Sequence, residues 1–350
     1  SVGRFTQMTR RTLLIGTANG AFRAEMNGGE PRVEALGLDD VGGLRCPLVV
    51  DCHDPNVLFA GTVSAGVLRS DDGGRTWQAM NDGLSKLEIW WLEQHPVTGD
   101  LWAGTSPASM FKSDHGGKHW RECDQVQALP RVPEWTFPNP PHIPHVKHIS
   151  LRAEDPSDIL AAVEEGWLIR SRDGGATWQN LTEGTEFDSH TAYFMPDDPR
   201  VIISTSGSGV YRSEDGGASF AASDAGLDRR YMAHLVVNAS RPRTVFTAAA
   251  AVPPPGWSRP EGAHSAVYRS LDQGRQWARL TGGLPEDLPA APRAVAGDPS
   301  DAETVCVGMT DGTVWLTEDG GESFRPALKM PTPSAGLRAA GVSSLRLLNA

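Results

Sequence analysis

One eight-residue motif, which occurs six times, limits what this chain of 350 residues can fold into. Its pattern is Ser/Thr-x-Asp-x-Gly-x-Thr/Ser-aromatic, and its clearest copy runs from Ser70 to Trp77, whereas the second copy is degenerate. A period of roughly 40–50 residues is typical of a repeat protein. The copies begin at Ser70, Ser113, Ser171, Ser213, Ser270 and Thr317, so successive starts lie 43, 58, 42, 57 and 47 residues apart.

Each copy has the residues of a tight turn. The Asp side chain, such as that of Asp72, can accept hydrogen bonds from backbone N–H groups further along the turn. Gly73 and Gly74 permit a positive φ without steric cost, and the aromatic residue can enter an apolar layer. Short apolar strands precede the copies, as at 66–69, 168–170, 209–212 and 266–269. The motif therefore predicts the turn of a β-hairpin.

The motif closely resembles the Asp-box, or BNR, repeat found in sialidases, sortilin-type receptors, xyloglucanases and photosystem assembly factors. The resemblance covers nearly the whole chain and implies a β-propeller. It implies no particular activity, because proteins with this repeat differ widely in what they do.

The segments between the motifs predict four antiparallel strands per repeat. Six repeats follow one template, in which the first strand ends in an Asp-Pro-like turn. The segments 12–17, 20–24 and 32–36 read as three strands without a first one, while 341–348 reads as a first strand with nothing after it. If the two ends share one blade in this way, the ring closes and loses its open edges.

We therefore predict an all-β fold, a seven-bladed β-propeller whose N- and C-terminal strands share one blade. Six blades is the alternative if the shared blade is misread. Residues 9–350 are expected to form a single propeller domain, and residues 1–8 to be disordered or a remnant of expression.

Composition narrows the partners and the location. The net charge of −11 argues against nucleic acid and anionic membranes as partners. No apolar run is long enough for a transmembrane helix. The four cysteines lie far apart without CxxC spacing, which favours a reducing compartment, so we expect a cytoplasmic protein.

Two Pro-rich insertions, 124–146 and 251–264, interrupt the regular spacing. Long loops in a compact domain are usually functional or disordered. The first insertion precedes a first strand and the second joins a second strand to a third, so both are expected on the face where the first strands begin. The motif turns are expected on the opposite face. The insertions would then surround the channel mouth, where propellers commonly hold ligands.

Three histidines occupy similar positions in consecutive first strands. His148 lies eight residues before the Pro that ends its strand, as does His234, while His190 lies nine before its own. Because first strands line the channel, we expect the three imidazoles to converge and to bind one transition-metal ion, Zn, Cu or Fe. A metal-bound water could then act as a nucleophile. The alternatives are a plain polar channel, or an acid/base or ligand-binding role without metal.

Other candidates surround these histidines. His145 precedes His148 by three residues, and Glu88 takes the same position in the neighbouring blade. Glu88, His145 and Tyr231 are therefore catalytic candidates. A ligand pocket is predicted from the aromatic residues Trp91, Trp135 and Trp257 together with His145, with loop stapling as the alternative for these aromatics.

Three functions remain open. The first is a small-molecule pocket at the channel mouth, which could be a metal-dependent hydrolytic or oxidative enzyme. The second is a scaffold or assembly factor that binds a protein partner. The third is a glycoside hydrolase other than a typical sialidase, because the resemblance implies three substrate-binding arginines and a Tyr/Glu pair that this sequence does not show. Arg45 and Arg293 could face the channel, but they form no clear triad.

Overall fold

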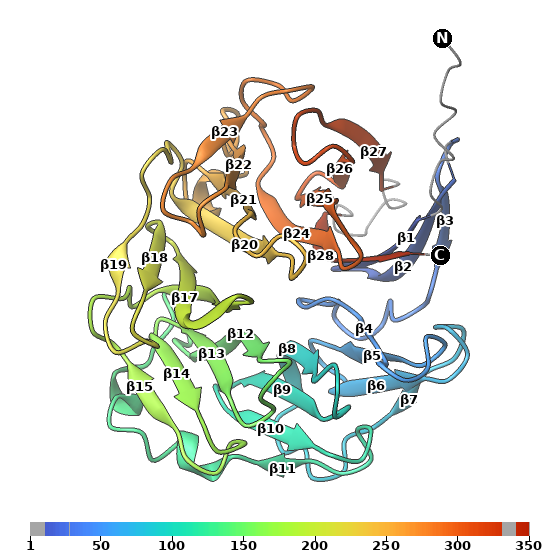
Figure 1. The fold of residues 1–350 in the computed structure, drawn as a ribbon. Helices are drawn as coiled ribbons and strands as arrows, with labels where there is room; N and C mark the ends of the chain where they lie inside the picture. The colour runs from blue at the N-terminus through green and yellow to red at the C-terminus, as the bar shows by residue number, and fades with distance from the viewer. Residues whose placement is uncertain (1–10, 28, 331–340, 350) are drawn as a thin grey trace.

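A computed structural model describes residues 11–27, 29–330 and 341–349 of the chain. These residues form seven four-stranded antiparallel sheets arranged as blades around a central channel (Figure 1). The predicted seven-bladed β-propeller is thus confirmed. The prediction for residues 1–8 lies outside the described residues.

The first blade joins the two ends of the chain, as predicted. Its strands are β28 (Val342–Asn349), β1 (Arg11–Thr17), β2 (Gly20–Met26) and β3 (Arg32–Ala35), in this order from the channel outward. The other blades contain β4 (Val49–Val50), β5 (Leu58–Gly61), β6 (Val67–Ser70) and β7 (Gln78–Ala79); β8 (Glu88–Gln94), β9 (Leu101–Ser106), β10 (Met110–Ser113) and β11 (Arg121–Glu122); β12 (His145–Leu151), β13 (Ile159–Glu164), β14 (Leu168–Ser171) and β15 (Gln179–Leu181); β16 (Ser189–Met195), β17 (Asp198–Ser206), β18 (Val210–Ser213) and β19 (Ala221–Ala222); β20 (Tyr231–Val237), β21 (Val245–Ala250), β22 (Ala266–Ser270) and β23 (Ala278–Leu280); β24 (Pro292–Asp298), β25 (Asp301–Met309), β26 (Thr313–Thr317) and β27 (Arg325–Lys329).

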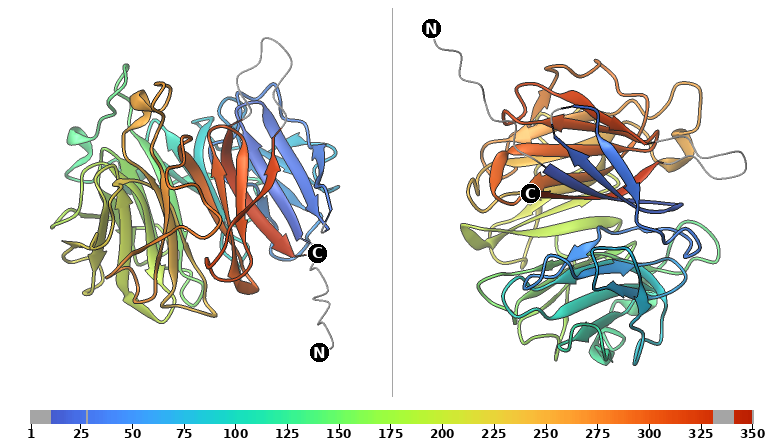
Figure 2. Two further views of the ribbon diagram at one scale, coloured as in Figure 1. Left: turned by 90° about the horizontal axis from the view of Figure 1, so that it is seen from above. Right: turned by 90° about the vertical axis from the view of Figure 1, so that its right-hand side faces the viewer.

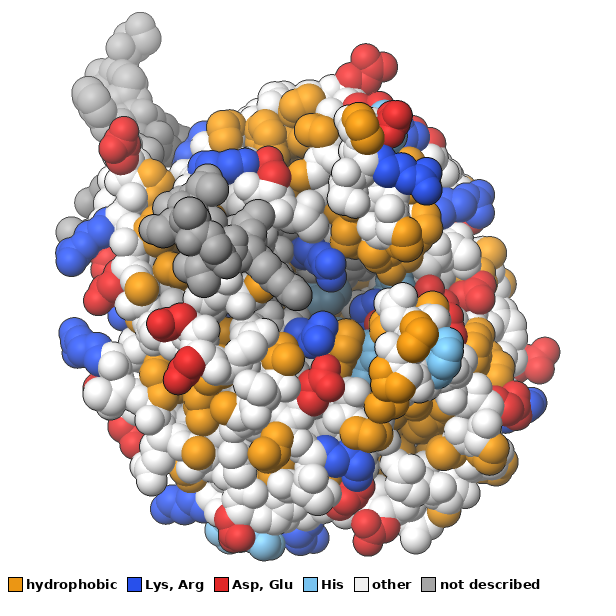
Figure 3. All heavy atoms as spheres, turned by 180° about the vertical axis from the view of Figure 1, so that it is seen from behind, with side chains coloured by type: hydrophobic (Ala, Val, Ile, Leu, Met, Phe, Trp, Pro, Cys, Tyr) orange, Lys and Arg blue, Asp and Glu red, His pale blue; other side chains and the backbone are white. Residues whose placement is uncertain are grey.

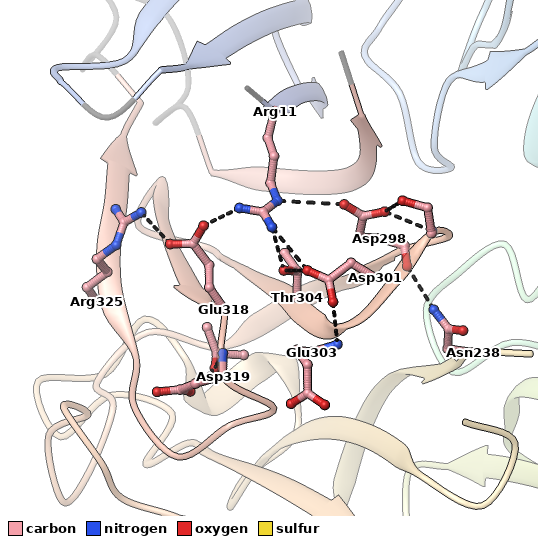
Figure 4. A network of polar contacts seen from close by, with 11 residues as sticks. Arg11, Asn238, Asp298, Asp301, Glu303, Thr304, Glu318, Asp319 and Arg325 are labelled. Atoms are coloured by element: carbon pink, nitrogen blue, oxygen red, sulfur yellow. Dashed lines mark hydrogen bonds and ion pairs between the residues drawn. The ribbon is translucent and has the colours of Figure 1, made fainter. Parts of the chain in front are cut away.

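A buried arginine ties the shared blade to its neighbour. Arg11 of β1 is only 7% exposed and reaches the blade that contains β24–β27. Its Nη2 lies 3.1 Å from Asp301 Oδ2 and its Nε 3.6 Å from Asp298 Oδ2, and Nη1 pairs with Glu318 (Figure 4). Thr304 Oγ1 accepts a further bond of 2.9 Å. The last seam of the ring is therefore held by charge as well as by the β1–β28 pairing.

The Asp-box copies form the turns that the sequence predicted. Asp72 Oδ1 accepts bonds of 2.9 Å from the backbone N–H groups of Arg75 and Thr76, and its Oδ2 accepts one of 2.7 Å from the Thr76 hydroxyl. Gly73 and Gly74 have φ of 75° and 93°. These hydrogen bonds to the charged form lower the pKa of the Asp72 carboxyl well below its usual range.

The motif aromatics also fasten neighbouring blades. Trp120 is 1% exposed, and its indole N–H donates to Met80 O at 2.8 Å, across the boundary between two sheets. Trp277 makes the same kind of contact with Ser223 O at 2.8 Å. The motif therefore stabilises the ring as well as the hairpin in which it lies.

Both insertions rise from one face, as predicted, and Figure 2 shows them together on the side opposite the N-terminus. They contain the short 3-10 helices η1 (Asp124–Val126), η2 (Val132–Glu134) and η3 (Pro254–Gly256). Among the described residues, no helix is long and apolar enough to cross a membrane. The four cysteines are free thiols, and the cytoplasmic location stays a prediction.

Candidate functional site

Six of the innermost strands carry a β-bulge near the same end of the channel. In β12, for example, Val146 pairs with Val163 and His148 with Ala162, so Lys147 is the extra residue. Bulges re-aim side chains and are frequent next to active sites. The extra residues are Trp90 in β8, Lys147 in β12, His190 in β16, Ala233 and His234 in β20, Arg293 in β24, and Ser343 in β28. Every one of them lines the cavity at the channel mouth.

This cavity has a volume of about 410 Å³ and lies on the face that carries the insertions. Its walls combine aromatic rings with cations. Trp257, from the second insertion, stands 5.6 Å from Tyr231 between ring centroids. Figure 3 shows basic and histidine side chains around the hollow at the centre of this face. The cavity therefore differs in charge from the chain as a whole, whose net charge is −11.

Two arginines form the cationic wall. The guanidinium of Arg45 lies 4.0 Å above the Trp90 ring and 3.2 Å from Glu88 Oε1. That of Arg293 lies 4.8 Å above the Trp257 ring. Within the described residues Arg293 has neither a hydrogen bond nor an ion pair. Desolvation by the surrounding wall, together with nearby Arg45, lowers the pKa of Arg293, so an anion placed here would be attracted strongly.

Opposite this wall, two carboxylates meet His190. Glu164, at the end of β13, is buried, and it pairs with Lys147 Nζ at 2.7 Å and with His145 Nε2 at 2.6 Å. Burial would raise the pKa of Glu164, but Lys147 and His145 outweigh it and hold the pKa low. Asp188 Oδ1 lies 3.4 Å from His190 Nε2, and Glu164 Oε1 lies 3.9 Å from the same atom.

One ring nitrogen of His190, Nε2, lies near these two carboxylates but forms no hydrogen bond among the described residues. The Nδ1 atom lies 3.0 Å from Met232 O, and because a carbonyl can only accept, Nδ1 carries the hydrogen. In the neutral ring Nε2 then keeps its lone pair. This atom is buried, and it has no hydrogen-bond partner in the part of the chain that the structure describes.

The structure does not gather the three predicted histidines around one point. His148 and His234 face each other across the channel, with 6.1 Å between ring centroids, and Trp91 contacts both at 4.4 and 5.1 Å. His190 instead joins Glu164 and Asp188, the group of donors that the described residues bring within 4.8 Å of one another. The physical reason is the bulge, because His190 occupies the position of Lys147, one residue earlier than that of His148.

His148, His234 and Trp91 narrow the channel instead. A second cavity of about 410 Å³ lies on the other side of these three residues. Trp91 and His234 each line both this cavity and the mouth cavity. The backbone N–H of Ala192 donates to His148 Nδ1 at 3.4 Å, so the neutral His148 ring carries its hydrogen on Nε2. Burial lowers the pKa of both histidines, to about 3 for His234.

Of the other predicted site residues, some line the mouth cavity and others are buried away from it. Tyr231 and Trp257 line the mouth cavity, and Tyr231 lies 5.0 Å from the His190 ring. His145 stacks on Trp90 with 3.2 Å between ring centroids and is buried. Trp135 lies in the apolar core, so it acts as a loop staple.

Some important residues were missed. Lys147, Trp90, Glu164 and Asp188 are not among the site residues predicted from the sequence. A signal did exist for three blades: Lys147, His190 and Ala233 each lie nine residues before the Pro that ends their strand turn, and this offset marks the bulge position in these blades. The offset of His190 therefore places it with Lys147 and Ala233, and not with His148 and His234.

Comparison with known proteins supports the fold. No protein-family model matches the chain, and no curated protein matches it either. The GH74 xyloglucanase from Xanthomonas campestris is similar in structure, with a TM-score of 0.67, 18% identity, and coverage of 96% of this chain and 52% of the enzyme. The GH74 enzyme of Niastella koreensis gives a TM-score of 0.61 and 17% identity over 81% of this chain and 45% of the enzyme. The chain thus spans about half the length of these enzymes.

A second kind of similar structure is YCF48 bound to D1 peptide. It gives a TM-score of 0.58 and 14% identity, and the match covers 89% of this chain and 92% of YCF48. Identities this low show the fold alone. The seven blades and the repeated turns make the chain a seven-bladed β-propeller, similar in fold to these proteins.

Proposed function

We propose that the protein binds a small anionic molecule with a planar or apolar part in the cavity at the channel mouth. The observation that carries this proposal is Arg293, which projects into the cavity over Trp257 and has no anionic partner in the described chain. A guanidinium offers five N–H donors in a geometry that suits carboxylate or phosphate.

The remaining walls fit the rest of such a ligand. The rings of Trp257 and Tyr231 lie beside Arg293, and the ring of Trp90 lies beneath Arg45. Pockets of about this size typically combine apolar walls with a few polar groups that orient the ligand. The cavity volume of about 410 Å³ suits a small molecule.

An acidic peptide segment is the second candidate. It is favoured by the structural similarity to YCF48, which was determined bound to D1 peptide. A peptide carboxylate would satisfy Arg293 in the same way, and the two Pro-rich insertions could contact the chain that leads to it. An assembly or scaffold role would follow from this mode of binding.

Glycoside hydrolysis has weaker support. It requires two carboxylates that flank an open cleft. Glu164 is engaged by Lys147 and His145, and Glu88 by Arg45 and the Trp90 indole N–H. An enzyme that uses a metal ion at this mouth remains a proposal.

Calorimetric titration tests the anionic preference. We expect benzoate, indole-3-acetate or glucuronate to bind at least tenfold more tightly than the matched neutral benzamide, indole-3-acetamide or glucose, because a hydrogen bond to a charged group contributes about 1.5–3 kcal/mol. Arg293→Gln should remove this preference. Arg275→Gln, on the opposite face, is the control and should leave it unchanged.

An acidic tetrapeptide in the same titration separates the two candidates. If only the peptide binds, and Arg293→Gln abolishes its binding, the peptide-binding alternative replaces the small-molecule proposal. If no anion binds, or if Arg293→Gln binds as tightly as the wild type, the proposed function is overturned.

A further inference from the structure

We propose that Glu164, Asp188 and His190 bind one divalent transition-metal ion, of the Mn²⁺, Fe²⁺ or Zn²⁺ type, in the wall of the mouth cavity. The site does not depend on the anion proposed above. It also differs from the three-histidine site expected from the sequence, since His190 is the one shared residue.

The donor atoms are already close to a ligand arrangement. One oxygen of each carboxylate and His190 Nε2 lie within 4.8 Å of one another. Two of these separations, both from Nε2, are 3.4 and 3.9 Å. Ligand atoms bound to one ion at about 2.0–2.2 Å can lie up to about 4.4 Å apart, so a small side-chain adjustment would complete the set.

His190 is oriented so that its Nε2 lies near the two carboxylates. Its Nδ1–H donates to Met232 O at 3.0 Å, and metal-ligating histidines almost always donate their second ring N–H in this way. In the neutral ring its Nε2 keeps the lone pair, and this buried atom has no hydrogen-bond partner among the residues described. A buried acceptor without a partner is costly unless a ligand uses it.

The chemistry of the donors selects the ion. Carboxylate oxygens suit Mg²⁺, Ca²⁺ and Mn²⁺, whereas imidazole suits Zn²⁺ and Fe²⁺. A mixed set of two oxygens and one nitrogen therefore favours first-row transition metals over Mg²⁺ and Ca²⁺. Because His190 and Tyr231 line the cavity, the remaining coordination positions face space that water or a ligand can enter.

Lys147 is the built-in competitor for the ion. Its ammonium lies 2.7 Å from Glu164 Oε1, the oxygen of Glu164 that lies 3.9 Å from His190 Nε2. Metal binding must displace this ammonium, and Lys147 can move because it also lines the open cavity. Lys147→Met should therefore strengthen metal binding by removing the competing charge.

The test uses the whole 350-residue chain, stripped with EDTA and titrated with Mn²⁺ and Zn²⁺. Bound ion is measured by elemental analysis and, for Mn²⁺, by electron paramagnetic resonance. We expect one ion per chain, at least tenfold weaker binding in Asp188→Asn and in His190→Gln, and tighter binding in Lys147→Met.

Glu165→Gln is the matched control, because it removes one negative charge next to Glu164 without removing a proposed ligand. If Glu165→Gln weakens binding as much as Asp188→Asn, the carboxylates attract ions only diffusely and the site is overturned. Binding by Lys147→Met but not by the wild type would show that lysine replaces the metal, which also overturns it. If His190→Gln fails to fold, the metal binding measured for Asp188→Asn decides whether the proposal stands, since the Asp188 side chain is 32% exposed.

Discussion

The two faces of the propeller use charged groups in opposite ways. On the Asp-box face, the carboxylates of the turns accept bonds from their own backbone, and Arg11 fills the space between Asp298, Asp301 and Glu318 (Figure 4). On the mouth face, Arg293 has no anionic partner, as far as the described residues extend. Groups satisfied within the fold stabilise it, whereas groups left open towards a cavity are available for a ligand.

The largest expected effect is at Arg11. Arg11→Met should lower the free energy of unfolding by about 3–5 kcal/mol, because it leaves the buried Asp298 without a countercharge. Urea denaturation measures the change. Arg325→Met, which removes an exposed partner of the same Glu318, should cost less than about 1 kcal/mol. Similar losses in both variants would mean that Arg11 does not hold the ring closed.

Acid tests the histidines at the narrow part of the channel. Both His148 and His234 have a pKa below the unfolded value of about 6.5, so the folded state binds fewer protons and its stability falls as pH drops below 6.5. Carboxylates with lowered pKa, such as Glu164, lose their contribution only below about pH 4.5. Between pH 6.5 and 5 we therefore expect a loss of up to about 1.5 kcal/mol per histidine.

Unfolding curves at several pH values check this slope. His234→Gln and His148→Gln should each remove roughly the part of this pH-dependent loss of stability that the replaced histidine causes. His115→Gln, on the surface, should leave the slope as it is. An unchanged slope in both channel variants would show that these rings are not kept neutral by burial.

At the mouth, Lys147→Met tests whether Lys147 stabilises the carboxylate of Glu164 as Arg11 stabilises that of Asp298. We expect a smaller loss, about 1–2 kcal/mol, because His145 still donates to Glu164 at 2.6 Å. Lys329→Met removes an exposed pair with Asp311 and should cost less than about 1 kcal/mol. A loss as large as that of Arg11→Met would place the mouth cluster among the structural ones.

The fold could be predicted from the sequence because its signals are local. The spacing from Ser70 to Thr317 indicates the number of blades, and the segments 12–17 and 341–348 supply the strands by which the two ends of the chain complete one blade. The indole bond from Trp120 to Met80 could not be foreseen, since it depends on how two sheets pack.

The site was harder to predict because one inserted residue changes where a side chain points. Counting back from a Pro placed His148 with His234 correctly, but it could not show that the bulge aims Lys147 and His190 into the mouth. Asp188 lies just before β16, and no periodicity indicates where its carboxylate goes. Ion pairing between blades is a property of packing and leaves no spacing in the sequence.

The smallest expected effect concerns the one degenerate Asp-box. His115 stands where the other copies have Asp, and His119 where the full copies have Thr, so this turn lacks the carboxylate that binds both the N–H and the hydroxyl of Thr177 in the intact copy at Asp173. The Ser113 hydroxyl still accepts the Gly117 N–H at 3.1 Å, which keeps the backbone of the turn in place.

Restoring the motif with His115→Asp and His119→Thr should therefore stabilise the protein by only about 0.5 kcal/mol. The gain of two or three exposed hydrogen bonds is partly offset by loss of the 2.8 Å contact between His119 and Asp82. Urea midpoints measure it, with Asp173→His and Thr177→His as the reverse change. If the restored turn is less stable than the wild type, the two histidines contribute to that face in their own right, and the contrast between a self-satisfied face and an open one no longer holds at this blade.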